Sequence, residues 1–480
     1  MKEKIIKNYL YSLTYQLLTI IVPLVTTPYI ARVLSSKEMG LYDYSLTICT
    51  YFMFVASAGI PILAQREIVT CGDELEKCFS FYYKLRLWLS IVVFCVYCLV
   101  VLLFFNNKII YFIQGIGIIA SGFDISWYYA GRENFKTIMN RNIVFKIFSI
   151  VLLFAFVKGK YSLIFYVLTI TVPNLIGNFL FFWKLDVKII PVSVDLNSIS
   201  ATLKASIMLL IPSLVLQLYS IIDKTILGSL STLSELGYYA QVFKIINLFV
   251  LCASTLGNVV FPQMVRKYNE NKQEMCMLVS KSLDVVIHLF FFLLFGFSAC
   301  VDVFSDWFYG KNYTGIDNLL IMAIPIAVFK ALSYIIANQA LLASNREKDL
   351  IIVMFQGTFI NCLFDLMFVK SFGAKGAIIA TVISEIFILI KSLRLFKKKI
   401  GNIVLLNTDN IRATIAALFE CIVILGLKKY IVIENPIIYT LILGLIGTGV
   451  YIILLKVFND SYYLIVRKLI YNRVFCKGKR

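Results

Sequence analysis

Residues 87–105 read LWLSIVVFCVYCLVVLLFF, a run without a single charged residue. A transmembrane helix needs about 20 predominantly apolar residues to cross the hydrocarbon core of a bilayer. Helix is the expected state of this run, because a backbone inside lipid must satisfy its own hydrogen bonds. The run therefore predicts a membrane-spanning helix.

The rest of the chain has the same apolar character. Of its 480 residues, 60% are hydrophobic and 15% are charged, whereas water-soluble proteins carry roughly 25% charged residues. A soluble protein of this size cannot cover so much apolar surface, so lipid must surround most of it. We predict an all-α polytopic membrane protein with about fourteen transmembrane helices and no large soluble domain.

Further apolar runs follow one another along the chain. We expect spans at 9–31, 41–63, 87–105, 109–130, 143–157, 163–183, 206–228, 238–262, 283–303, 316–343, 350–369, 374–390, 411–426 and 437–457. No small-residue cleavage site follows a short apolar core at the beginning of the chain. We therefore interpret the first run as a retained helix rather than a signal peptide.

The basic residues alternate between the two sides of this arrangement. With both termini in the cytoplasm, the cytoplasmic segments hold 31 Lys and Arg residues and the outer loops hold 10. The positive-inside rule produces such an excess in short cytoplasmic loops. We therefore expect a multi-pass protein of a bacterial-type inner membrane with both termini cytoplasmic. The net charge of +19 is explained by this topology and by anionic lipids, rather than by nucleic acid binding.

Residue usage disfavours several kinds of site. His288 is the only histidine, and no GxxxxGK[ST] phosphate loop is present. We therefore expect neither a His-based metal site nor ATP hydrolysis by a phosphate loop. Cys95 and Cys98 match CxxC, but they lie inside an apolar run, where two small helix residues are the simpler interpretation. We expect no cofactor, no metal and no enzymatic activity.

A short motif occurs twice at matching topological positions. Glu-x-Gly-x-Tyr occupies residues 38–42 and again 235–239, an offset of 197, and each copy precedes the second span of a six-span block. Arg-Glu follows the fourth span of each block, at 132–133 and 346–347. Blocks with an even number of spans share one orientation, so the repeat predicts two like lobes. The glutamates and glycines can equally serve as helix caps.

The repeat divides the chain into five predicted parts, and a polar cavity is expected between the two lobes. The parts are an N-terminal six-helix lobe at 1–183, a cytoplasmic linker at 184–205, a C-terminal six-helix lobe at 206–395, an extra helix pair at 396–457 and a basic cytoplasmic tail at 458–480.

The chain resembles the polysaccharide-transporter family, which contains O-antigen and capsule repeat-unit flippases. The resemblance rests on Pro23, on PYIARVL at residues 28–34 and on the two Glu-x-Gly-x-Tyr motifs. The family belongs to the multidrug/oligosaccharidyl-lipid/polysaccharide superfamily. The resemblance implies two six-helix bundles, often with two added helices. It also implies transport of an undecaprenyl-diphosphate-linked oligosaccharide from the cytoplasmic to the outer leaflet by alternating access.

Such a cargo requires cations inside the membrane, because an unpaired diphosphate in hydrocarbon is very costly. The candidate substrate-binding cations are Arg32, Arg66, Lys224, Lys244 and Lys330. In the superfamily the first, second, seventh and eighth helices line the cavity, which favours Arg32, Lys224 and Lys244. Snorkelling to the interface explains Arg32, Arg66 and Lys244 equally well, whereas Lys330 lies too deep for that.

Acidic residues inside the spans are fewer, and each is a candidate for a coupling-ion site or a charge pair. They are Asp124, Asp223, Asp365, Glu385 and Glu420. Asp223 can pair with Lys224, and the two glutamates can instead bond neighbouring helices. The aromatic and amide groups that can face a glycan or another helix are Tyr15, Gln16, Gln217 and Tyr219.

We therefore expect a monomeric flippase for capsule or O-antigen biosynthesis. Its expected partners are undecaprenyl-diphosphate oligosaccharide, membrane lipids, H⁺ or Na⁺ as coupling ion, and a polysaccharide polymerase. The alternatives are a cation-coupled multidrug exporter and a peptidoglycan lipid flippase of the same superfamily. An exporter of organic cations would favour an acidic cavity. A membrane glycosyltransferase or polymerase would need a larger outer loop than residues 304–318 provide.

Overall fold

The computed structural model describes residues 2–464 and 467, except for residues 160, 193, 194, 406 and 432. The described residues form helices, turns and loops, with no β-strand among them. Eleven helical segments of this part are long and apolar enough to cross a membrane. The predicted all-α, multi-pass fold is confirmed, and the count of fourteen spans stays a prediction. Most of the predicted basic tail at 458–480 lies outside the described residues.

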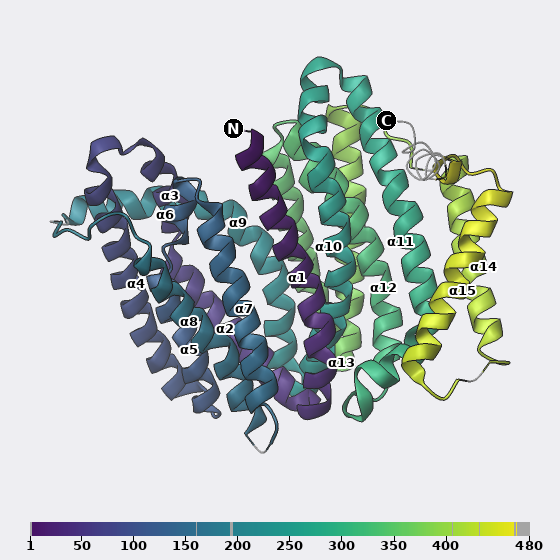
Figure 1. Ribbon diagram of the computed structural model, residues 1–480, viewed down its shortest axis with the longest axis horizontal. Helices are drawn as coiled ribbons and strands as arrows, with labels where there is room; N and C mark the ends of the chain where they lie inside the picture. Colours follow the sequence, from purple (N-terminus) through teal and green to yellow (C-terminus); the bar gives the residue numbers. More distant parts are fainter. Residues whose placement is uncertain are drawn as a thin grey trace. The chain divides into compact units, whose positions relative to one another are not determined.

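Two compact units make up the chain, at Met1–Gly237 and Tyr238–Arg480 (Figure 1). The helices of the first unit are α1 (Lys2–Val33), α2 (Ser36–Ser57), α3 (Ile60–Thr70), α4 (Leu75–Phe104), α5 (Lys108–Phe123), α6 (Ser126–Gly131), α7 (Phe135–Phe156), α8 (Ser162–Trp183) and α9 (Leu196–Leu230). Helix α10 (Leu233–Glu270) begins in the first unit. The second unit continues with α11 (Lys272–Phe308), α12 (Ile316–Ser333), the π-helix η3 (Tyr334–Leu341), α13 (Glu347–Lys399), α14 (Thr408–Leu427) and α15 (Pro436–Val457).

Two of the predicted spans in the first unit are each divided into two helices. Ala58 and Gly59 separate α2 from α3, because both adopt the left-handed backbone that ends a helix, with φ of 43° and 76°. Asp124 and Ile125 separate α5 from α6. Arg66 consequently lies on a short helix of its own, α3, which packs against α4, α6 and α9.

The short helices α3 and α6 cover an aromatic core beside the start of α4. Phe79 stacks against Trp127 with ring centroids 5.4 Å apart, and it meets Tyr128 edge to face at 5.1 Å. These three rings and Tyr82 are all buried. Aromatic pairs in such geometries add to the stabilisation that burial itself supplies. The core therefore stabilises the packing of α3 and α6 against the start of α4.

Helix α13 is a hairpin of two helices rather than one straight rod. Gly373 interrupts it with φ of 55° and ψ of −132°, values suited to glycine. A straight helix would place Gly357 and Ile388 roughly 45 Å apart, yet a Cβ on Gly357 would lie 2.5 Å from the Ile388 side chain. Lys399 and Asp349 close the open end with an ion pair of 2.6 Å. The two arms match the two spans predicted at 350–369 and 374–390.

Helices α14 and α15 pack against α11 and against each other (Figure 1). A buried polar network fixes one end of this group. The Asp284 carboxylate on α11 accepts hydrogen bonds from Asn410 on α14 and from the Tyr462 hydroxyl. One turn along α11, the His288 ring lies 3.1 Å from Asp460, which follows α15. The lone histidine therefore ties the end of the helix pair to the unit.

Both copies of the repeated motif cap helices. Ser35 and Glu38 form a capping box at the start of α2, and Thr232 accepts a hydrogen bond from the Glu235 backbone at the start of α10. The motif glutamates therefore lie at helix N-termini, as one of the two sequence interpretations proposed.

The glycines of the repeated motif make reciprocal contacts within the first unit. A Cβ on Gly40 would lie 1.6 Å from the Leu233 carbonyl oxygen, and one on Gly237 would lie 1.9 Å from the Ser36 carbonyl oxygen. Leu233 is the counterpart of Ser36 at the repeat offset of 197. The first turns of α2 and α10 therefore touch with local two-fold symmetry, a relation that glycine alone permits.

Candidate functional site

In the first unit, one predicted cation forms a close ion pair inside the helices. The Lys224 ammonium on α9 donates to Asp43 on α2 at 2.6 Å. The Asp43 side chain is only 5% exposed, and that of Lys224 is 27% exposed. One residue further along α9, the Thr225 hydroxyl lies 2.9 Å from the Tyr51 hydroxyl on α2. Two polar contacts therefore join α2 to α9 within apolar surroundings.

The second unit contains a looser pair of the same kind. The Lys330 ammonium on α12 lies 3.8 Å from a Glu385 carboxylate oxygen on α13, with side chains 28% and 3% exposed. Removing two charges from water is costly, and attraction between them repays this cost only with good geometry. At 3.8 Å the pair lies beyond normal hydrogen-bond length. It is therefore less tightly held than the first pair.

A π-helix begins one turn after Lys330. Helix α12 continues through Tyr334–Leu341 with π geometry. Within it, the Tyr334 hydroxyl and the Gln339 amide each lie 3.3 Å from the Asn258 side-chain oxygen on α10. π-Helical turns are rare and occur frequently at functional sites. The π-helix brings the Tyr334 phenol and the Gln339 amide together at Asn258, and such groups can bond to hydroxyls and phosphates.

The other predicted cations lie at separate places on the helices. Arg32 is exposed at the end of α1, where its guanidinium donates to the Pro28 carbonyl at 3.2 Å. Arg66 is exposed on α3, and Lys244 is half-buried on α10. Among the polar candidates, Gln217 is exposed and Tyr219 is buried on α9. The side chains of Tyr15 and Gln16 lie outside the described part of the structure.

Asp124 lies in a charge pair with a partner that the sequence analysis did not consider. Arg86 on α4 is buried and lies 3.7 Å from the Asp124 carboxylate, and its guanidinium also donates to the Asp124 carbonyl. The same carboxylate accepts from the Ser126 backbone at 2.9 Å, which starts α6. Its contacts are therefore those of a structural link between α4, α5 and α6.

Three further acidic candidates are buried among apolar helices. Asp223 on α9 is 3% exposed, and Asp365 on α13 is fully buried one turn after the equally buried Asn361. Glu420 on α14 is 2% exposed. Its carboxylate fills the space above two glycines, because a Cβ on Gly296 or Gly447 would lie 2.5 Å or 2.8 Å from it.

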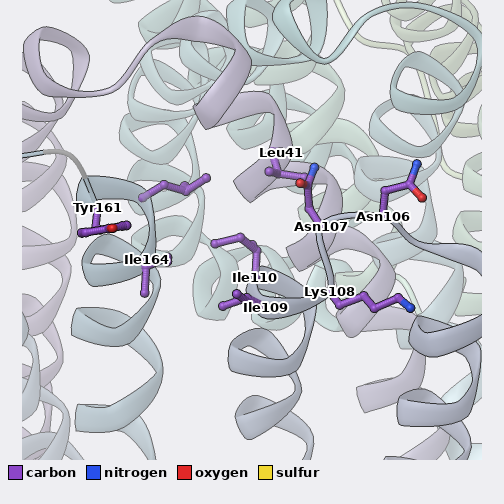
Figure 2. A pocket seen from close by; sticks show the side chains of 9 residues that line it. Leu41, Asn106, Asn107, Lys108, Ile109, Ile110, Tyr161 and Ile164 are labelled. Carbon is purple, nitrogen blue, oxygen red and sulfur yellow. The ribbon is translucent and has the colours of Figure 1, made fainter.

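A separate pocket of about 380 Å³ opens in the first unit where α5 and α8 begin. Figure 2 shows Asn106, Asn107 and Lys108 on one side of it and Tyr161 on the other. Its floor is apolar and includes Ile110. Amide, ammonium and phenol groups over an apolar floor can bond to hydroxyl groups of a polar ligand. None of these residues belongs to the predicted cation set.

Asp43 is the functional candidate that sequence reasoning missed. It lies within the predicted span 41–63, directly after the first Glu-x-Gly-x-Tyr motif. A carboxylate inside an apolar span is a functional candidate by default, so the signal was present. The sequence suggested Asp223 as the partner of Lys224 instead, because the two residues are adjacent in the chain. Adjacent residues of a helix point in different directions, whereas Asp43 faces Lys224 from another helix.

Comparisons with known proteins agree with this architecture. The sequence profile of the family described as polysaccharide biosynthesis protein matches residues 5–268. A protein of Escherichia coli (strain K12) named for O-antigen transport is 20% identical over 391 residues, which cover 79% of this chain and 93% of the relative. Agl15 of Haloferax volcanii, named for flippase activity in low-salt glycan biosynthesis, is 23% identical over 167 residues, 35% of each chain.

Solved structures show the same fold. The lipid II flippase MurJ in an inward closed conformation aligns with a TM-score of 0.74 at 15% identity, over 94% of this chain and 98% of MurJ. An inward-facing multidrug resistance transporter of the MATE family aligns with a TM-score of 0.64 at 14% identity, over 82% and 98% of the two chains. At this level of identity the likeness concerns the fold alone.

Proposed function

The chain belongs to the family described as polysaccharide biosynthesis protein, and from this premise we propose that it is a flippase for a lipid-linked oligosaccharide. The cargo is an undecaprenyl-diphosphate-linked repeat unit, carried from the cytoplasmic to the outer leaflet of a bacterial inner membrane by alternating access. Both termini face the cytoplasm. The names of the relatives support the class of cargo, since one is named for O-antigen transport and one for glycan flipping.

One observation carries the mechanism: in each unit a lysine of a membrane helix is paired with a buried carboxylate. The pairs are Lys224–Asp43 and Lys330–Glu385. A lysine that is held by a carboxylate remains charged and inside the helices without substrate. A diphosphate is a stronger competitor, because it carries more charge and more acceptor oxygens than one carboxylate.

Counter-ion exchange then follows from simple electrostatics. The diphosphate takes the place of a carboxylate beside the lysine, and the carboxylate takes it back when the cargo leaves. At an effective dielectric constant near 20, one charge pair about 4 Å apart is worth roughly 4 kcal/mol. Each lysine can therefore offset part of the cost of removing the diphosphate from water. Binding stays reversible because each lysine keeps its own carboxylate as the alternative partner.

The same pairs offer a place for a coupling ion. A carboxylate that loses its lysine to the cargo is left charged in apolar surroundings, which is costly. Binding of H⁺ or Na⁺ removes that cost. Glu385, at 3% exposure and 3.8 Å from its lysine, is the more readily exchanged carboxylate of the two. Loss of that ion restores the charge of the carboxylate, which then recovers its lysine and favours release of the cargo.

Complementation of a flippase-null strain tests the proposal. We expect Lys224→Gln and Lys330→Gln each to lower surface polysaccharide at least about tenfold, with membrane protein levels checked in parallel. Lys456→Gln is the matched control, because Lys456 lies exposed in the last turn of α15. Vesicles with purified protein and a fluorescent undecaprenyl-diphosphate oligosaccharide give the direct measurement.

Two results would overturn the proposal. Normal polysaccharide export by the Lys224 and Lys330 variants, singly and combined, would remove the lysines from the mechanism. Rescue of a multidrug-exporter or lipid II flippase mutant, without any movement of the oligosaccharide lipid, would assign the chain to one of the two alternative transport classes.

A further inference from the structure

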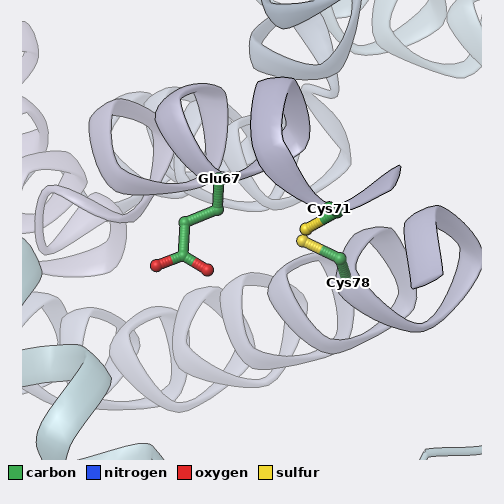
Figure 3. A group of neighbouring side chains, drawn as sticks. All are labelled: Glu67, Cys71 and Cys78. Carbon is green, nitrogen blue, oxygen red and sulfur yellow. The ribbon is translucent and has the colours of Figure 1, made fainter. Parts of the chain in front are cut away.

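The geometry points to a thiolate metal site at the turn between α3 and α4, formed by Glu67, Cys71 and Cys78. One carboxylate oxygen and the two sulfur atoms all lie within 4.8 Å of one another. Figure 3 shows Cys71 at the turn and Cys78 on the following helix, with their sulfur atoms turned toward each other. Both cysteines are free thiols. The site shares no residue with either lysine–carboxylate pair and does not depend on the proposed transport.

Local structure brings the three ligands together. Glu67 and Cys71 are four residues apart at the end of α3, so both face the same side of that helix. The chain then turns through Gly72–Glu74 and enters α4 at Leu75. Cys78 lies one turn into α4. The spacing C-x₆-C is not a common zinc signature, which explains why the sequence analysis did not predict this site.

The donor set selects the metal. Two thiolates with one carboxylate suit Zn²⁺ and the softer Cd²⁺, whereas Mg²⁺ and Ca²⁺ prefer oxygen ligands alone. In a tetrahedral zinc site, ligand atoms at about 2.0–2.3 Å from the metal lie roughly 3.5–3.8 Å from one another. Separations within 4.8 Å therefore need only small side-chain rotations. Binding of M²⁺ releases the two thiol protons, and the fourth position is left for water.

The surroundings suit a metal that enters from solvent. Glu67 is exposed and both cysteines are half-buried, so an ion can reach the ligands. Tyr82 lies one turn beyond Cys78 on the same face of α4, where its hydroxyl can orient the Glu67 carboxylate. Tyr82 itself is anchored in the aromatic core beside α3 and α6. A bound ion would link the end of α3 to the start of α4. Unlike a disulfide, this link forms without an oxidant.

Metal titration of the reduced, purified full-length protein tests the site. We expect one Cd²⁺ or Zn²⁺ per chain, with thiolate-to-metal charge-transfer absorption for Cd²⁺ and a metal-dependent rise in the thermal unfolding midpoint. Cys71→Ser and Cys78→Ser should each weaken binding by about 100-fold or more, since even the loss of an outer-sphere partner costs roughly 10–100-fold. By the same measure, Tyr82→Phe should weaken it about tenfold.

Matched controls separate this site from adventitious thiol binding. Cys95→Ser/Cys98→Ser removes the CxxC pair on α4, and Glu76→Gln removes a carboxylate near the same turn. Both variants should bind the metal as the unmodified chain does. The proposal fails if the unmodified protein takes up no metal, or if the Cys71 and Cys78 variants bind it equally well. It also fails if rapid alkylation of cells shows Cys71 and Cys78 joined in a disulfide.

Discussion

The two lysine–carboxylate pairs differ in how firmly their surroundings hold them. Lys224 and Asp43 meet at 2.6 Å, whereas Lys330 and Glu385 are 3.8 Å apart. The first pair lies between two regular helices that a second polar contact also joins, from Tyr51 to Thr225. The second lies just before a π-helix. Both pairs join a lysine to a carboxylate on a neighbouring helix, but the charged atoms are close together in the first pair and further apart in the second.

Backbone geometry explains the difference. Asp43 follows Gly40 by one turn, and Gly40 lets α2 approach the carbonyl of Leu233 closely. This contact sets the position of α2, and with it Asp43, relative to the start of α10. A π-turn, by contrast, carries an extra residue and disturbs the regular ladder, and the buried Asn338 side-chain oxygen within it has no hydrogen-bond partner among the described residues. We infer that the tight pair also positions the helices and that the loose pair exchanges its partner more readily.

The largest effect should come from breaking the tight pair. Lys224→Gln leaves the Asp43 carboxylate, only 5% exposed, without its cation. Loss of one partner of a buried pair costs about 3–5 kcal/mol, so we expect a marked fall in the thermal midpoint of the purified protein. The double variant Lys224→Gln/Asp43→Asn should recover most of that stability but not transport. Equal midpoints for the single and double variants would refute the pairing.

A slightly smaller effect should follow from Gly40→Ala. The added methyl would lie 1.6 Å from the Leu233 carbonyl oxygen, so the backbone must shift. Overpacking of this kind costs typically about 1–3 kcal/mol. Gly449→Ala is the control, because nothing lies within 4 Å of its Cβ. Thermal unfolding of both variants measures the difference, and a tolerated Gly40→Ala would show that Asp43 is not positioned through this contact.

The loose pair should show weak coupling. A double-mutant cycle with Lys330→Gln and Glu385→Gln isolates the interaction energy of the two side chains. Coupling energies of contacting residues span about 0.5–3 kcal/mol, and we expect the second pair near the lower end and the first near the upper end. Transport should nevertheless fall in both Lys330 and Lys224 variants. Stronger coupling in the second pair than in the first would reverse the comparison.

The smallest effect is expected at a buried carboxyl group that forms no ion pair among the described residues. One Glu420 oxygen has no hydrogen-bond partner among the described residues, and the side chain is 2% exposed. A charged carboxylate would be very costly there, so the group is expected to be protonated. Glu420→Gln should therefore change stability by less than about 1 kcal/mol, because the amide keeps the size and neutrality of a protonated carboxyl group. A large loss of stability, measured against Glu385→Gln, would show that Glu420 carries a charge.

The candidate site could be predicted from the sequence only in part. Lys224 and Lys330 stood out because a charged residue inside an apolar run is costly and must be compensated. Their pairing with Asp43 and Glu385 could not be predicted, because the paired residues are 181 and 55 positions apart in the sequence. The proposed metal ligands Glu67, Cys71 and Cys78 could not be predicted, because their spacing matches no common metal-binding pattern. Which polar side chains on different helices come into contact depends on how each helix is rotated about its axis. Hydropathy gives no information about that rotation.

By itself the sequence determined the membrane environment, the helical state and the repeated motif at residues 38–42 and 235–239. These follow from hydrophobicity, from backbone hydrogen bonding and from local capping, which all act between near neighbours. Only the tertiary structure decided the breaks after α2 and α5, the hairpin at Gly373 and the partner of each lysine. Those features depend on how closely helices approach one another, and that distance is set by side chains far apart in the chain.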